Sequence, residues 1–196
     1  MIKNPIELRL SKLKDWQLRT FMVCLCERMY LNYALFCLQT RFADPNKFRS
    51  ILNLVWESLL VNNTKINFDS QLEKLESLIP EADKFDFYGV GPAMDACEAV
   101  SELLHSYLNS DIVNHAKRIS AISLCTVADF EQASQGQYLA EAELKNLPNI
   151  VNELDIQWEI YRLLKVENIR NIELIKGLKD DLVESKISNL GFFLNN

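Results

Sequence analysis

Turn-forming residues are scarce in this sequence, and their scarcity constrains the fold more than any other feature. Glycine and proline occur only five times each among 196 residues. Architectures built from β-strands need many tight turns, and those turns depend on glycine and proline. The uninterrupted segments instead repeat their apolar residues at the spacing of an α-helix. The clearest stripe consists of Phe48, Ile51, Leu52, Val55, Leu59 and Leu60.

Length and composition extend this prediction. Folding a chain of 196 residues removes roughly 70% of its unfolded surface from water, so the core needs neither disulfides nor metals. The apolar fraction of 48% and the charged fraction of 24% are ordinary for a globular protein, and we do not expect disorder. We therefore expect residues 1–196 to form a single all-α domain, a bundle of about seven to nine helices.

Two helix starts are marked by a capping residue followed by proline. Asn4-Pro5 and Asp44-Pro45 each combine a side chain that accepts a hydrogen bond from a free amide with a proline suited to the first helical position. Between them, apolar residues cover all sides of the segment 21–26, so we expect a central helix there. Asn32 is a candidate kink or restart of that helix.

The segment 80–93 is the least regular part of the interior. Its run Gly89-Val90-Gly91-Pro92 lacks the Lys-Ser/Thr pair of a phosphate-binding loop, and no strand precedes it. The proline also removes one of the amides that such a loop would use. We expect a turn that orients the following helix.

The C-terminal part predicts one long helix with a bend. The helical pattern runs from Pro148 to about Glu184, and its apolar stripe changes phase between Leu164 and Ile169. A bend near residue 167 would accommodate this change. Apolar residues in the tail after Ser188 are expected to dock on the bundle or on a second chain; they are Leu190, Phe192 and Phe193.

Charge and hydropathy exclude two classes of partner. The net charge is -6 and the pI is about 5.1, whereas nucleic-acid binding draws its affinity from lysine and arginine. The longest apolar stretch, Phe21 to Leu38, is interrupted by Glu27 and Arg28, and no apolar run reaches the roughly 20 residues of a membrane span. The N-terminus carries no signal-peptide pattern. We expect a cytoplasmic protein that binds neither nucleic acid nor membranes.

The five cysteines are expected to be reduced core residues. Cys24 and Cys26 lie two positions apart, so on a helix their side chains point in nearly opposite directions and cannot share a metal ion. Most of the cysteines lie in apolar helical runs, which favours buried thiols in a reducing compartment.

One helix face could carry metal or acid–base chemistry. Asp95, Glu98, Glu102 and His105 are spaced by three, four and three residues, which places them on one side of a helix. Glu102 and His105 also have the Glu-x-x-His spacing of di-metal bundles, but the only other histidine, His115, lacks a matching glutamate. We expect a solvated polar face and no cofactor, with a metal held by Glu98, Glu102 and His105 as the alternative.

Several charges lie within apolar helices. If these charges are buried they must be paired, so salt bridges between helices are predicted for Glu27 and Arg28, for Glu57, and for the set Asp155, Glu159 and Arg162. The alternative is a polar pocket between helices, the place where bundles commonly build ligand sites. The side chains suited to its walls are Trp56, Trp158 and Tyr161.

Five segments resemble a known family. The segments 21–37, 66–90, 92–106, 155–160 and 172–182 are similar to the YjaG-like family of bacterial proteins, known as domain of unknown function 416. The resemblance covers nearly the whole chain. It implies an all-helical cytoplasmic protein of Gram-negative bacteria, and it implies no activity and no functional residues.

Two hypotheses about function follow. The leading one is a non-catalytic protein that acts through contacts with a protein partner or with itself as a homo-oligomer, because no catalytic set is complete and the tail is apolar. The alternative is a small-molecule or metal-binding bundle, or an enzyme, that uses the face from Asp95 to His105. Bound metal in the purified protein would favour the second.

Overall fold

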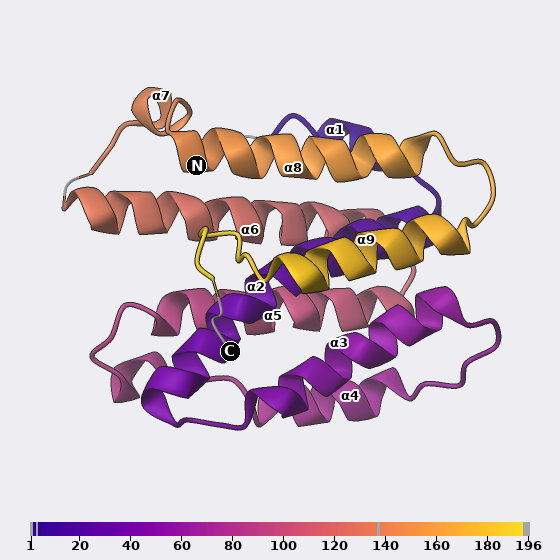
Figure 1. Cartoon of the computed structure of the whole chain (residues 1–196), viewed down its shortest axis with the longest axis horizontal. Helices are drawn as coiled ribbons and strands as arrows, with labels where there is room; N and C mark the ends of the chain where they lie inside the picture. Colours follow the sequence, from indigo (N-terminus) through magenta and orange to yellow (C-terminus); the bar gives the residue numbers. More distant parts are fainter. Residues whose placement is uncertain (1, 3, 137, 194–196) are drawn as a thin grey trace.

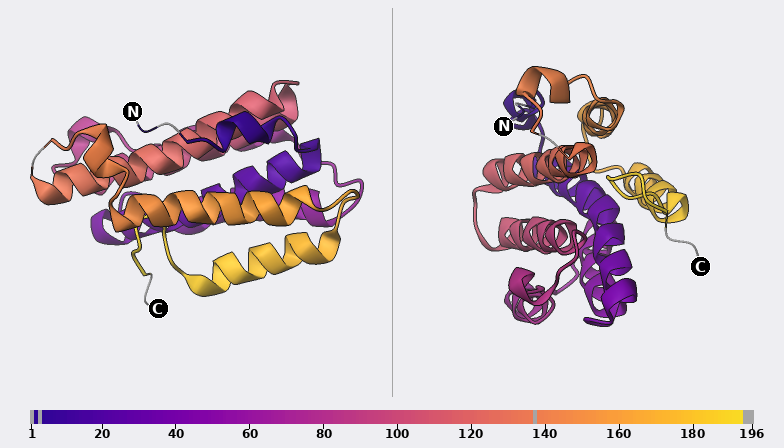
Figure 2. Two further views of the ribbon diagram at one scale, coloured as in Figure 1. Left: turned by 90° about the horizontal axis from the view of Figure 1, so that it is seen from above. Right: turned by 90° about the vertical axis from the view of Figure 1, so that its left-hand side faces the viewer.

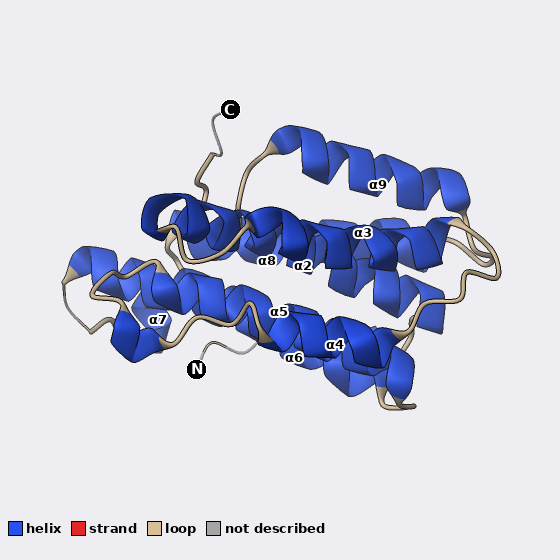
Figure 3. Ribbon diagram, turned by 90° about the horizontal axis from the view of Figure 1, so that it is seen from below, coloured by secondary structure: helices blue, strands red, loops and turns tan. Residues whose placement is uncertain are grey.

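The fold consists of helices alone in the part of the chain that the structure describes. This computed structural model describes residues 2, 4–136 and 138–193, and within them it contains nine α-helices and no strand (Figures 1 and 3). The elements are α1 (Glu7–Leu10), α2 (Asp15–Thr40), α3 (Pro45–Leu60), α4 (Phe68–Glu76), a 3-10 turn (Ala82–Lys84), α5 (Val90–Leu108), α6 (Ile112–Gln135), α7 (Glu141–Leu144), α8 (Pro148–Lys165) and α9 (Ile172–Ser185). The prediction of an all-α bundle is confirmed.

Helix α2 is the centre of the molecule. It contacts α3, α5, α6, α8 and α9, and the segment from Phe21 to Met29 is buried on every side, including Glu27 and Arg28. Its length and hydropathy would also suit a membrane span, but most of it is covered by other helices, as in the core helix of a globular protein. The helix runs unbroken through Asn32, so the restart proposed there is wrong.

The other helices surround α2 in pairs. Helices α5 and α6 form an antiparallel pair against one side of it, and α4 covers α5. Helix α8 packs on α6 and α2, while α9 packs on α2 and α3 (Figure 2). Both α8 and α9 thus rest on α2, so a surface between them can remain open.

The two predicted cap-plus-proline starts have different outcomes. Asp44 accepts a hydrogen bond from the Asn46 amide at 2.9 Å, and α3 begins at Pro45 as predicted. The first helix begins only at Glu7, after the predicted start, and Asn4 does not cap it. Asn4 Oδ1 accepts the Ile6 amide at 3.1 Å in the turn before the helix, while its Nδ2 donates to Gln157 Oε1 on α8 at 2.8 Å, so this side chain makes a local and a tertiary contact at once.

The predicted long C-terminal helix is two helices. Helix α8 ends at Lys165 and α9 begins at Ile172, so the chain breaks where only a bend was expected. Asn171 accepts a hydrogen bond from the Leu174 amide at 3.1 Å and thereby caps a new helix with its own direction. Beyond α9, Leu190 is buried in a small apolar cluster with residues of α6 and α8, so the described part of the tail docks on its own bundle.

Candidate functional site

The predicted acidic face is partly occupied by contacts with α6. Glu102 Oε2 lies 2.5 Å from His115 Nδ1 and 3.2 Å from Arg118 Nη1, so this carboxylate joins α5 to α6. His115 is buried, and its Nε2 lies 2.9 Å from the side-chain oxygen of Asn109. The sequence pattern pointed to His105 as the partner of Glu102, whereas the structure provides His115.

The remaining residues of that face do not add a ligand to this contact, although the His105 ring stacks on the His115 ring with centroids 6.3 Å apart. His105 is exposed and its Nδ1 lies 2.8 Å from the Ser101 carbonyl, while Glu98 is exposed on its own. Asp95 accepts the Thr126 hydroxyl at 2.7 Å, and burial raises the pKa of this carboxyl. Nowhere in the described residues do three histidine, cysteine or acidic side chains gather as a metal ion requires. The metal alternative stays a prediction, without a preformed ligand set in the described chain.

The cysteine pair lies in the core, as predicted. Cys24 and Cys26 are fully buried in the main hydrophobic cluster. Burial raises the pKa of both thiols far above the usual range, so neither forms the thiolate that metal binding or nucleophilic chemistry requires.

The predicted salt bridges form at Glu27 and Arg28. Glu27 accepts hydrogen bonds from Arg49 of α3 at 2.7 Å and from the Trp56 indole at 2.9 Å. Arg28 forms an ion pair with Glu153 of α8, and both side chains are buried. The corresponding prediction is wrong at Glu57, Asp155 and Glu159, which are exposed and form no ion pair with the described residues.

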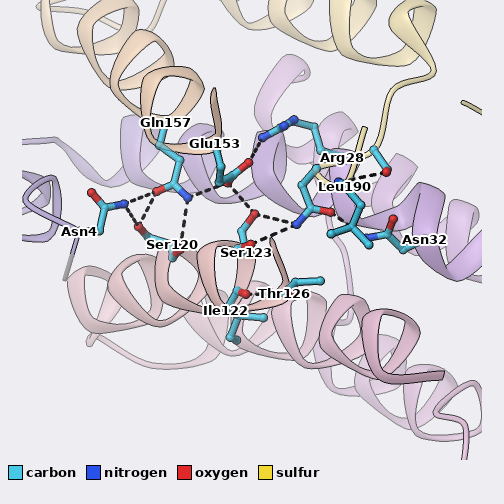
Figure 4. A network of polar contacts seen from close by, with 12 residues as sticks. Asn4, Arg28, Asn32, Ser120, Ile122, Ser123, Thr126, Glu153, Gln157 and Leu190 are labelled. Carbon is cyan, nitrogen blue, oxygen red and sulfur yellow. Dashed lines mark hydrogen bonds and ion pairs between the residues drawn. The ribbon is translucent and has the colours of Figure 1, made fainter. Parts of the chain in front are cut away.

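A buried polar network extends from the Arg28–Glu153 pair in two directions (Figure 4). Toward the N-terminus, Glu153 accepts from Gln157 Nε2 at 2.8 Å, and Gln157 bonds Ser120 and Asn4. The network therefore connects α2, α6 and α8 to the N-terminal segment. Ser120 and Gln157 were not predicted to take part, and the signal available in the sequence was their position on the inward sides of α6 and α8.

Toward the C-terminus, the network ends at an unpaired atom. Glu153 accepts from the Ser123 hydroxyl at 2.7 Å, and Asn189 of the tail donates its Nδ2 to the Ser123 carbonyl at 3.2 Å. A carbonyl can only accept, so Asn189 must turn its Oδ1 toward Asn32. Asn32 then donates its Nδ2 at 2.7 Å, and its own Oδ1 is buried without a hydrogen-bond partner.

Asn32 also lines an apolar pocket of about 370 Å³. The pocket lies between α2, the start of α5, the end of α6 and the tail. Its walls include Phe36, Phe87, Tyr88, Phe130 and Phe192. Three of these rings form a chain, with centroids 5.9 Å apart for Tyr88 and Phe130 and 5.3 Å apart for Phe130 and Phe192. This apolar pocket differs from the polar pocket predicted between helices, and none of Trp56, Trp158 and Tyr161 lines it.

Gly89 is required by the pocket wall. A Cβ atom at this position would lie 2.3 Å from a ring carbon of Phe87, whereas one at Gly91 would meet nothing within 4 Å. The Phe87 ring can therefore lie against the backbone only because residue 89 has no side chain. The contact with Phe87 explains why residue 89 is a glycine in the run Gly89-Val90-Gly91-Pro92, which was predicted to be a turn.

A second concavity, a groove of about 380 Å³, separates α8 from α9. Apolar side chains of both helices line it, together with the carboxylates of Glu159 and Asp181 and the side chain of Arg28. Glu159 and Asp181 form no ion pair within the described chain, while the charge of Arg28 is balanced by Glu153. The apolar residues of the groove are Ile156, Ile160, Leu163, Leu178, Leu182 and Ile187.

Comparisons with known proteins identify the family. A family described as "Protein of unknown function (DUF416)" matches residues 5–193. The uncharacterized protein YjaG of Escherichia coli strain K12 is 55% identical over 97% of both chains, and an uncharacterized protein of Haemophilus influenzae is 46% identical over the same shares. The crystal structure of a DUF416 family protein from Shewanella baltica has a TM-score of 0.90 and 34% identity, covering 98% of this chain and 100% of that one. The family resemblance and the fold are confirmed: the chain belongs to the DUF416 family, whose function is unknown.

Proposed function

We propose that this protein acts through non-catalytic contact with a protein partner, and that the groove between α8 and α9 is the docking surface. The observation that carries the proposal is the composition of the groove. Apolar side chains of two helices line an open concavity, and its unbalanced charges are the two carboxylates of Glu159 and Asp181. Apolar grooves between helices are a common way to bind a helix of another protein.

The geometry favours a helix as the occupant. Ile156, Ile160 and Leu163 recur at four and three positions along α8, so they form one row along the groove wall. Leu178 and Leu182 form the matching row on α9. A third helix can place a ridge of apolar side chains between these rows, in the way packed helices interdigitate.

The charges specify the partner further. Glu159 and Asp181 stand on opposite walls, on α8 and α9, and both are exposed. A bound helix with lysine or arginine beside its apolar ridge would pair with both carboxylates, whereas an acidic helix would be repelled. We therefore propose a basic amphipathic helix as the partner. The five free cysteines support the cytoplasm as the place of this contact.

A peptide pair tests the proposal. The probes are an amphipathic helix of alanine, leucine and lysine as long as α8 (18 residues) and the same peptide with glutamate in place of lysine. Fluorescence anisotropy with the full chain should show that the lysine peptide binds about tenfold more tightly. The double variant E159K/D181K should reverse this preference. The control E73K/E76K makes the same charge change on exposed positions of α4 and should preserve the preference.

Two results would contradict the proposal. Equal binding of both peptides would show that the carboxylates select nothing, and an equal effect of the α4 control would show that only net charge matters. Self-association is separated by light scattering of the full chain: a dimer that E159K/D181K dissociates would assign the groove to a second copy instead of a different partner.

A further inference from the structure

We propose that the aromatic pocket beside Asn32 is a small-molecule site, and that its ligand is a flat, uncharged aromatic compound with one N–H or O–H donor. The donor binds Asn32 Oδ1, and the rings of the pocket enclose the apolar body. This site lies apart from the groove between α8 and α9 and does not depend on the protein contact proposed there.

The acceptor is the first argument. Asn32 is 5% exposed, and its Oδ1 has no partner although it is buried. Folded proteins pair almost all buried polar atoms, because an unpaired one loses its hydrogen bonds to water without replacement. The Asn32 side chain cannot resolve this by turning over, since Asn189 Oδ1 already requires its Nδ2. Neighbouring side chains cover Oδ1, so a ligand in the pocket that displaces this cover with its own donor would complete the network.

The walls are the second argument. Among the lining residues the aromatic rings predominate, and they can stack on a flat ligand from more than one side. The lining has no carboxylate, histidine, lysine or arginine, so a charged ligand would find no counter-ion. The pocket's 370 Å³ lies near the lower end of the range for small-molecule sites, which favours a compact ligand.

The one titratable side chain that lines the pocket, Tyr88, is also consistent with an uncharged ligand. Burial, together with the nearby carboxylates of Asp129 and Asp95, raises the pKa of Tyr88 to about 12. Its hydroxyl is therefore neutral at physiological pH. The side chains of Phe87, Tyr88 and Phe192 remain between 41% and 45% exposed. They belong to two non-helical segments at the pocket mouth, which marks the route by which a ligand reaches Asn32.

Two isosteric probes test the site on the full chain. Carbazole carries one N–H, and fluorene has the same three rings with a CH₂ group in its place. Equilibrium dialysis should show that carbazole binds about fivefold to tenfold more tightly than fluorene, the value of one buried hydrogen bond. In Asn32→Leu this preference should disappear. Phe192→Ala should lower the affinity for both probes equally. Phe193→Ala, at a position outside the pocket lining, should change neither affinity.

The comparison of the two probes needs no variant, so it decides the question even if Asn32→Leu fails to fold. Equal affinity of carbazole and fluorene for the natural chain would overturn the role of Asn32, because the N–H group would then contribute nothing to binding. Failure of both probes to bind, or binding that Phe192→Ala leaves unchanged, would overturn the pocket as the site.

Discussion

Removing the positive charge of Arg28 should destabilise this protein more than any other single change on α2 that preserves size. Arg28 is 5% exposed and Glu153 is fully buried, so neither charge is compensated by water. In Arg28→Met, Glu153 keeps only two neutral donors, the Ser123 hydroxyl and the Gln157 amide. Breaking a buried ion pair from one side costs about 3–5 kcal/mol of the free energy of unfolding. For a chain of this size, that lowers Tm by about 6–20 °C.

A double variant separates the pair from its surroundings. Arg28→Met combined with Glu153→Gln removes both charges, and the glutamine oxygen can still accept from Ser123 and Gln157. What remains is an unpaired side-chain NH₂, which costs about 1–3 kcal/mol. The double variant should therefore be more stable than Arg28→Met alone, although it differs from the natural sequence at one more position.

Urea unfolding followed by circular dichroism measures these differences. The free energies of the natural chain, both single variants and the double variant form one thermodynamic cycle. A cost below about 1 kcal/mol for Arg28→Met would refute the assignment of a desolvated ion pair. So would a double variant that is no more stable than Arg28→Met, since the two charges would then act independently.

Two further predictions concern α5. Gly89→Ala should cost about 1 kcal/mol or less in urea unfolding, because the new Cβ meets the far end of the Phe87 side chain, which is 41% exposed and can turn away, while Gly91→Ala should be neutral or stabilising by up to about 1 kcal/mol; equal effects at both positions would contradict the close approach. Burial raises the pKa of Asp95 above its unfolded value, so the folded state binds its proton more tightly, and this carboxyl destabilises the fold as pH rises through that interval. Asp95→Asn, whose side-chain oxygen can still accept from Thr126, should therefore stabilise the protein at pH 7 by an amount that shrinks toward pH 4; a gain independent of pH would point to a cause other than the charge.

Local features of the fold were predictable from sequence because they depend on neighbouring residues. The helical stripe of α3 and the cap at Asp44 require only the side chains within one or two turns. The pairing of Arg28 was also predictable, since a buried charge needs a partner wherever that partner lies. The family resemblance identified the fold independently of these patterns.

Features that depend on which helix covers which face were not predictable. Periodicity placed Glu102 on one side of α5, but only the packing of α6 shows that His115 is the group in contact with it. The same limit applies to Asn4, whose local bond to the Ile6 amide follows from its neighbours but whose tertiary bond to Gln157 does not. Asn32 stood out in the sequence as a break, although its polar side chain serves a contact with the tail and not a change in the backbone.

The position of Asn189 in the chain determines when the buried network can be completed. Arg28, Ser123 and Glu153 all precede the tail in the chain, yet the Asn32 side chain receives its partner from residue 189. Helices α2, α6 and α8 can therefore pack before residue 189 is in place only if the Asn32 side chain stays unpaired. Docking of the segment around Asn189 therefore belongs to core formation, because a chain cut before this residue would leave the buried Asn32 side chain without any hydrogen-bond partner.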